Sequence, residues 1–198
     1  MQAIYRIGPV TLLALFMLCC QQPPERILVF SKTEGFRHAS IADGKIALLK
    51  LGAELGARAD TTEEAHYFHP DSLKHYRAVV FLNTTGDVLN DEQQAAFEQY
   101  IQSGGGYVGI HAATDTEYDW PWYGKLAGAY FDGHPGNPNV REGQVTVVDG
   151  SHPATQGLPE TWVKRDEFYD FKDLNPNLNT LITVDVASYF LYMMCDFL

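Results

Sequence analysis

Three short apolar runs constrain the fold of this 198-residue chain more than any other feature. They cover residues 26–31, 78–82 and 107–110, and turn-forming or polar residues bound each of them. A continuous apolar run of this length is typical of a strand that is buried on both faces, as in parallel sheets. Because segments with helical periodicity separate the runs, the sequence predicts an α/β fold with a mostly parallel central sheet covered by helices on both faces.

Local signals predict where the helices begin. Ser40 and Asp43, three residues apart, resemble a capping box, and a helix to about residue 56 is expected to follow. Its apolar face would consist of Ile41, Leu48, Leu51 and Leu55. Asn90 and Gln93 predict a second capping box and a second helix. Together these signals favour a three-layer sandwich that is flavodoxin-like or a near relative.

Weaker signals mark the remaining elements. A strand at 57–60 and a short helix at 70–75 are expected, and Pro121 suits the first turn of a later helix. The alternation in 144–147 favours an antiparallel or edge strand, and further strands are expected at 162–168 and 178–184. No break divides the chain, so one domain is predicted for residues 26–189.

Residues 1–20 resemble a signal peptide. Arg6 precedes an apolar run over residues 10–18 that is too short to span a bilayer. Cys19 or Cys20, followed by the polar linker 21–25, would carry the lipid of a bacterial lipoprotein. We expect export, either as a periplasmic or outer-membrane-anchored lipoprotein or as a secreted protein.

The net charge of −11 restricts the partners of the chain. Nucleic acid and anionic membrane surfaces would repel it, so membrane contact is expected only through a lipid anchor, and a small neutral ligand or a cation suits the protein better. Cys195 is the single cysteine outside the leader, which excludes an internal disulfide and a metal site built from thiolates.

His111 is the strongest candidate for chemistry. Gly109 and Ala113 flank it in the pattern of a nucleophile elbow at the carboxyl end of a strand, where open α/β sheets bind ligands. Histidine can act there as acid, base, nucleophile or metal ligand. We expect His38 to meet it, because neighbouring strand ends lie about 5 Å apart. The alternatives are a strand-end histidine that only binds backbone and a solvated His38.

Glu167 is the candidate carboxylate. It lies among apolar neighbours, where a raised pKa would suit proton transfer, although an ordinary polar strand face would look the same. The expected substrate-binding residues are Arg37, Thr85, Asp115, Trp120, Tyr169 and His152. Arg37 in a surface salt bridge and Trp120 in the core are the alternatives to such roles.

A metal centre is the second interpretation of the same residues. His38, His111 and Glu167 provide two imidazoles and a carboxylate, which suffice for a catalytic zinc site with an open position. The acid–base interpretation requires no cofactor.

Four ordered motifs together resemble one known family, the ThuA-like (trehalose utilisation) family. They occupy residues 33–41, 105–112, 152–159 and 166–169, within a similarity that covers about residues 26–189. The resemblance implies a class I glutamine amidotransferase-like fold with His111 at the position of the amidotransferase cysteine, so the protein is not expected to be an amidotransferase.

The resemblance also implies a role in bacterial carbohydrate catabolism. The expected partner is a carbohydrate, a trehalose-like disaccharide or its keto derivative, and the expected enzyme class is a sugar-processing hydrolase or isomerase. Family members usually continue beyond residue 189 in a different pattern from the apolar residues 190–198, so the domain is expected to be incomplete at its C-terminus. A sugar-binding module without catalysis, or an inactive fragment, is the remaining alternative.

Overall fold

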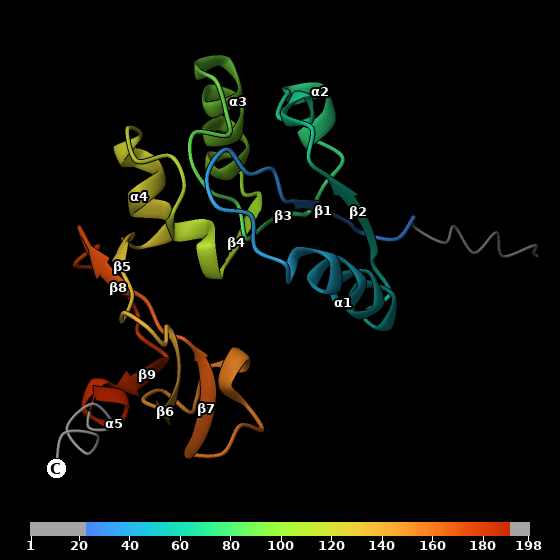
Figure 1. The fold of residues 1–198 in the computed structure, drawn as a ribbon. Coiled ribbons are helices and arrows are strands. Elements are labelled where there is room, and N and C mark those ends of the chain that lie inside the picture. Colours follow the sequence, from blue (N-terminus) through green and yellow to red (C-terminus); the bar gives the residue numbers. More distant parts are fainter. Residues whose placement is uncertain (1–22, 191–198) are drawn as a thin grey trace, which may run out of the picture.

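The computed structural model describes residues 23–190 and has a four-stranded parallel sheet at its centre (Figure 1). The strands lie in the order β2-β1-β3-β4. Their bounds are β1 (Arg26–Phe30), β2 (Arg58–Thr62), β3 (Ala78–Leu82) and β4 (Gly106–Ile110). The three apolar runs thus form β1, β3 and β4, and the predicted α/β class is confirmed.

Helices cover the two faces of this sheet unequally (Figure 1). The longest, α1 (Ile41–Glu54), lies on one face by itself. On the other face lie α2 (Pro70–Leu73), α3 (Asp91–Gln102) and α4 (Pro121–Ala127). Short 3-10 turns occur at η1 (Ala65–Tyr67), η2 (His111–Thr114) and η3 (Pro153–Thr155).

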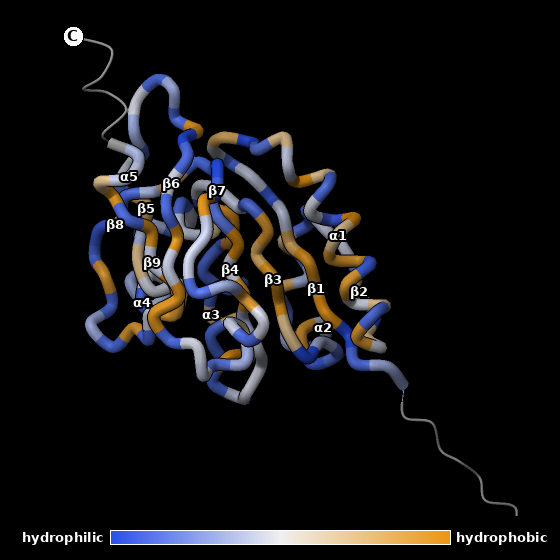
Figure 2. The backbone as a smooth tube through the Cα atoms, turned by 90° about the horizontal axis from the view of Figure 1, so that it is seen from below, coloured by the Kyte–Doolittle hydropathy of each residue, from blue (hydrophilic) through white to orange (hydrophobic). Residues whose placement is uncertain are grey.

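The main hydrophobic core lies between the sheet and α2, α3 and α4. Phe81 is fully buried at its centre, and its ring packs against Phe30 at 5.3 Å and Phe97 at 5.4 Å between centroids. The core on the α1 side is smaller and is built on Val29, Val80 and Leu82. Figure 2 shows the hydrophobic stretches along β1 and β3 that supply both cores.

The second half of the chain adds antiparallel strands at one end of the molecule (Figure 1). Strand β5 (Tyr130–Gly133) pairs with β8 (Asp170–Lys172), and β6 (Val140–Val147) pairs with both β7 (Thr161–Glu167) and β9 (Ile182–Asp185). The antiparallel pairing expected at 144–147 is confirmed, as are strands near 162–168 and 178–184. The sequence did not predict β5, β8 or the short α5 (Val186–Phe190).

The predicted apolar face of α1 is right for two of its four residues. Ile41 is 2% exposed and Leu48 packs against the core on this side of the sheet. Leu51 is 48% exposed, and Leu55 lies beyond the end of the helix and is 72% exposed. Two glycines complete the face that contacts the sheet: a Cβ on Gly44 would lie 2.9 Å from Leu82 Cδ1, and one on Gly52 would lie 3.3 Å from Ala59 Cβ. Because they have no side chain, they allow the helix to approach the sheet closely.

The two predicted capping boxes have different outcomes. At α3 the box is present, because Asn90 Oδ1 accepts from the Gln93 amide and Gln93 Oε1 accepts from the Asn90 amide. At α1, Ser40 is the N-cap residue, but its side chain makes no cap hydrogen bond within the described chain. That prediction was wrong, because the Ser40 hydroxyl bonds to Asn83 instead.

Several predictions fall on residues outside the described range. These are the signal segment 1–20, the lipidation candidates Cys19 and Cys20, and the tail 191–198 with Cys195. Between residues 23 and 190, no helix has the length and apolar character needed to cross a membrane.

Candidate functional site

The turn after β4 has the tight geometry that the elbow pattern predicts. His111 has a positive φ of 50° and begins η2, while Ala112 and Ala113 are buried beside it. A Cβ on Gly109 would lie 2.7 Å from the Tyr107 hydroxyl and 3.2 Å from Ala113 Cβ, so a larger residue would not fit. The small neighbours therefore allow the turn that presents the His111 ring at the carboxyl end of the sheet.

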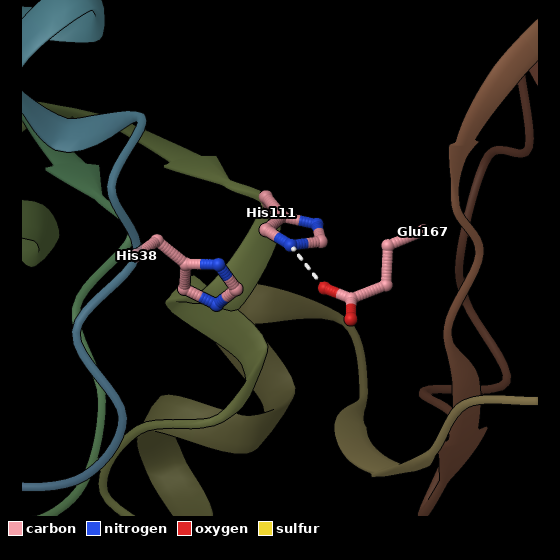
Figure 3. Close-up of side chains that lie close together, drawn as sticks. All are labelled: His38, His111 and Glu167. Atoms are coloured by element: carbon pink, nitrogen blue, oxygen red, sulfur yellow. Dashed lines mark hydrogen bonds and ion pairs between the residues drawn. The ribbon is translucent and has the colours of Figure 1, made fainter. Parts of the chain in front are cut away.

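Glu167 meets His111 from the end of β7 (Figure 3). His111 Nε2 and Glu167 Oε2 are 3.2 Å apart, and the side chains are 28% and 15% exposed. A contact of this length between partly buried groups is a hydrogen bond that fixes the imidazole against the carboxylate.

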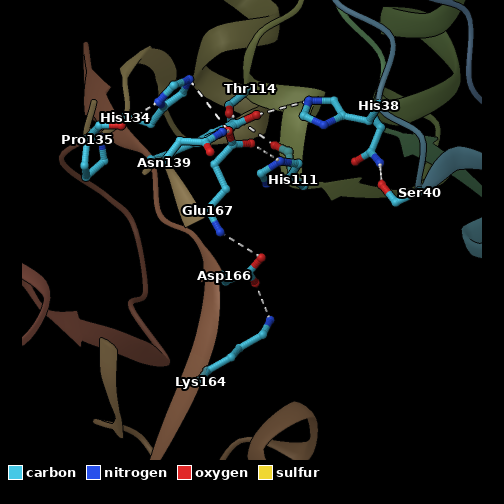
Figure 4. Close-up of polar contacts among 12 residues, drawn as sticks. His38, Ser40, His111, Thr114, His134, Pro135, Asn139, Lys164, Asp166 and Glu167 are labelled. Carbon is cyan, nitrogen blue, oxygen red and sulfur yellow. Dashed lines mark hydrogen bonds and ion pairs between the residues drawn. The ribbon is translucent and has the colours of Figure 1, made fainter. Parts of the chain in front are cut away.

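The second oxygen of Glu167 is also engaged (Figure 4). Asn139 Nδ2 donates a hydrogen bond to Glu167 Oε1, and His134 Nε2 lies 3.7 Å from the same oxygen. Both residues come from the connection between β5 and β6. Both carboxylate oxygens are thus held, which restricts rotation of Glu167 away from His111.

His38 meets His111 as the neighbouring strand ends predict. The two rings contact edge to face with centroids 4.7 Å apart, and His38 Nε2 lies 3.3 Å from the Tyr169 hydroxyl. Burial, followed by the charge of a protonated His111, lowers the pKa of His38. His38 is therefore neutral at pH 7 and available as a base or a ligand.

Tyr169 contacts both His38 and His111. Its ring lies 4.2 Å from the His111 ring and 4.3 Å from the Phe131 ring, between centroids. Burial, followed by the negative charge of Glu167, raises the pKa of Tyr169 well above its ordinary value. The hydroxyl consequently keeps its proton and can donate a hydrogen bond to a ligand.

Three of these side chains are also placed for a metal ion. The ligand atoms of His38, His111 and Glu167 all lie within 4.8 Å of one another, and each residue is partly buried. Two imidazoles and one carboxylate form a donor set that suits zinc.

A cleft of about 570 Å³ opens beside the histidines, between α1 and β7. Its polar lining includes His38, Ser40, Asn83, His111, Asp166 and Glu167. Burial would raise the pKa of Asp166, but Lys164, 2.6 Å away, lowers it overall. The volume is within the range of about 300–1,000 Å³ that is typical of small-molecule sites.

Arg37 and Thr85, both predicted to bind substrate, are engaged elsewhere. Arg37 forms a bidentate salt bridge with Glu63, with Nη1–Oε2 and Nη2–Oε1 distances of 3.1 and 2.9 Å, because its side chain points toward the end of β2. Thr85 is fully buried, donates to the Phe36 carbonyl and accepts from the Gly35 amide. Its hydroxyl therefore ties two loops together.

Trp120 and His152 are likewise placed outside the cleft, whereas Asp115 is close to the histidines. The Trp120 ring stacks on Trp122 at 5.1 Å and packs against the main core. His152 Nδ1 accepts from the Ala154 amide and so caps η3. Asp115 accepts from the Tyr118 hydroxyl at 2.6 Å, and its charge acts to raise the pKa of His38 against the larger effect of burial.

Sequence reasoning missed Asn139 as a site residue, because it belongs to no motif. Asn83 opens the loop 83–87, which directly follows the buried run 78–82 at the edge where ligands bind, and this position marks the loop as a candidate for holding substrate hydroxyl groups.

Comparison with solved structures identifies similar folds. A ThuA-like protein from Bacteroides uniformis is 26% identical, with a TM-score of 0.70 over 83% of this chain and 69% of that chain. One from Parabacteroides merdae is 19% identical, with a TM-score of 0.65 over 81% of this chain and 68% of that chain, and shares the fold. No curated protein matches the sequence.

The sequence also matches a family model over most of its length. The model is that of ThuA, described as trehalose utilisation, and the match covers residues 26–197. It includes all the residues of the cleft and every strand of the central sheet. This chain therefore belongs to the ThuA (trehalose utilisation) family.

Proposed function

We propose that this protein is a carbohydrate-processing enzyme in which His111 and Glu167 transfer protons on a trehalose-like disaccharide or its keto derivative. The observation that carries the proposal is the 3.2 Å contact between His111 Nε2 and Glu167 Oε2 in a cleft at the carboxyl end of the sheet. Family membership supports the substrate class.

The arrangement suits general acid–base catalysis. A carboxylate hydrogen-bonded to one imidazole nitrogen fixes the tautomer and stabilises the imidazolium that forms when the ring accepts a proton. Proton transfer by a positioned side chain contributes about 10²–10⁴-fold to a rate. His38, kept neutral, and the Tyr169 hydroxyl, kept protonated, provide a second acceptor and a second donor beside the pair.

The direct test is turnover by the purified protein. Trehalose, its keto derivative and related disaccharides are incubated with the wild type, His111→Ala and Glu167→Gln, and products are separated by chromatography. We expect turnover by the wild type and a loss of about 10²-fold or more in both variants. His66→Ala is the matched control, since His66 is 71% exposed and lies outside the cleft lining.

Two results would contradict the proposal. Unchanged turnover in His111→Ala would exclude a catalytic role for this residue. Sugar binding measured by calorimetry, without turnover of any compound, would instead identify a sugar-binding module.

A metal-dependent hydrolase is the second candidate, favoured by the 4.8 Å grouping of ligand atoms from His38, His111 and Glu167. Such an enzyme would use zinc to activate a water molecule. Elemental analysis of protein dialysed without chelator tests this candidate. One zinc per chain, lost in His38→Ala together with activity, would favour it, whereas full activity after chelation would support metal-free acid–base chemistry.

We further propose that the segment 1–20 directs export and that Cys19 or Cys20 carries a lipid. The apolar run before the cysteine pair and the polar linker after it support this proposal. Mass spectrometry of the mature N-terminus in Cys19→Ser and Cys20→Ser tests it, and an unprocessed Met1 would contradict it.

A further inference from the structure

Asn83 has an unusual backbone conformation at the edge of the candidate site. It follows the last residue of β3, is 3% exposed and has a φ of 50°, in the left-handed region. Its amide donates to the carbonyl of Ile110 at 3.2 Å, which ties it to the residue that precedes His111. Asn83 and His111 thus end neighbouring strands in the same left-handed conformation.

Only one of the two polar atoms of the Asn83 side-chain amide has a hydrogen-bond partner among residues 23–190. Asn83 Nδ2 donates to Ser40 Oγ at 2.9 Å. Ser40 is the N-cap of α1 but uses its hydroxyl for this contact and makes no cap bond within residues 23–190. The Asn83 Oδ1 atom is buried and finds no donor among the same residues.

This combination is rare in ordinary structural positions. A buried acceptor without a donor is unfavourable, so proteins leave few of them. A left-handed backbone is uncommon at residues other than glycine, among which asparagine adopts it most readily, and such residues gather at functional sites. Asn83 shows both features, and it lines the same cleft as His38, His111 and Glu167.

We propose that Asn83 is a substrate-binding residue whose Oδ1 accepts a hydrogen bond from a hydroxyl group of the carbohydrate. Ser40 is then a positioning residue, because it binds Nδ2 and leaves Oδ1 for the ligand. This inference rests on the proposed function and adds a specificity determinant to it. A ketone oxygen has no proton to donate, so Asn83 selects a hydroxyl at its position and excludes a keto group there.

The experiment separates ligand binding from a structural role of Asn83. Trehalose is the probe, its affinity is measured by calorimetry, and KM and kcat are measured for the substrate that the wild type converts. Asn83→Gly removes the amide but adopts a positive φ without strain. We expect Kd and KM to rise about tenfold, as for the loss of one well-placed hydrogen bond, with a smaller change in kcat.

Ser40→Ala is the matched control. It removes the acceptor of Nδ2 and leaves Oδ1, so we expect a smaller loss of affinity than in Asn83→Gly. Equal losses in the two variants, with equal losses of thermal stability, would assign Asn83 a purely structural role and overturn the inference. Wild-type affinity in Asn83→Gly would also overturn it.

Crystal structures provide a second readout. In the sugar-free protein we expect Asn83 Oδ1 to have no protein donor, and in the trehalose complex we expect a sugar hydroxyl within hydrogen-bond distance of it. A protein donor on Oδ1, or a water in place of the sugar hydroxyl in the complex, would overturn the inference while leaving the proposed function intact. If the wild type neither binds nor converts any sugar, the proposed function fails and the inference fails with it.

Discussion

His111 and Glu167 are 56 positions apart in the sequence, yet their side chains meet at 3.2 Å. His111 follows a strand of the parallel sheet, and Glu167 ends a strand of the antiparallel sheet. The contact therefore exists only when the two sheets are docked against each other. If the proposed catalysis by this pair is correct, we expect activity to depend on the position of the second sheet.

The substitution Glu167→Gln tests the contribution of the negative charge of this side chain. In Glu167→Gln the shape is kept, but the imidazolium at His111 loses its stabilising charge, so kcat/KM is expected to fall by about 10²-fold or more. We expect a small change in melting temperature, which calorimetry would measure. The control is Glu142→Gln, an exposed position on β6. An equal loss of activity in the control would contradict this prediction.

The depressed pKa of His38 makes stability depend on pH. Because the pKa of His38 in the folded protein lies below the ordinary imidazole value of 6.5, the unfolded chain takes up the proton first as the pH falls. Stability from this group is thus present above about pH 6.5 and is lost as the pH falls below it. Urea unfolding between pH 5 and 8 should show this loss, and His38→Gln should reduce it.

The matched control for the pH experiment is His66→Gln. His66 is exposed, and its removal should leave the pH dependence of the unfolding free energy as in the wild type. A pH dependence in His38→Gln identical to that of the wild type would show that burial of His38 does not contribute.

Glu117 anchors the loop before α3. It is 2% exposed, and one carboxylate oxygen accepts from the amides of Val88 and Leu89 while the other accepts from Gln94 Nε2. Glu117→Ala would leave these donors buried without an acceptor and should lower the free energy of unfolding by about 2–4 kcal/mol. Glu117→Gln keeps an acceptor for the amides, so we expect a loss of about 1 kcal/mol or less. Chemical denaturation would measure both, and equal losses would contradict the explanation.

The close approach of α1 to β3 predicts a steric effect. A Cβ on Gly44 would lie 2.9 Å from Leu82 Cδ1, so Gly44→Ala should lower the free energy of unfolding by about 1–3 kcal/mol despite the better helix propensity of alanine. Gly150→Ala is the control, because a Cβ there meets nothing within 4 Å. Thermal denaturation compares them, and a stabilised Gly44→Ala would contradict the packing described.

The sequence predicted the parallel sheet because three of its four strands, β1, β3 and β4, are continuous apolar runs, whereas the polar strand β2 gave only a weak signal. It predicted the second half less well: β5 and β8 are short, and the β8 residues are exposed, so they leave no periodic signal. The apolar face of α1 was predicted correctly at Ile41 and Leu48. It was extended wrongly to the exposed leucines, because Gly44 and Gly52 complete the contact and hydrophobic periodicity cannot register a residue without a side chain.

The position of each candidate residue relative to the strands explains which of them the structure brings together. His38 and His111 come after β1 and β4 of the parallel sheet, so their meeting can be predicted from the rule that strand ends converge. Arg37 and Trp120 lie in the predicted segments, but their side chains point away from the cleft. Arg37 points toward Glu63 and Trp120 toward the aromatic core, contacts that the local sequence does not reveal. Asn139 reaches Glu167 through a loop whose path only the folded chain defines.

We expect His111 and Glu167 to act as one catalytic unit, and a double-mutant cycle tests this coupling directly. The measurement is kcat/KM on the converted sugar for the wild type, His111→Ala, Glu167→Gln and the double variant. We predict that Glu167→Gln costs about 10²-fold or more in the wild type but less than about threefold when His111 is already alanine. Losses that multiply in the double variant would contradict this expectation, because they would show that the two side chains act independently.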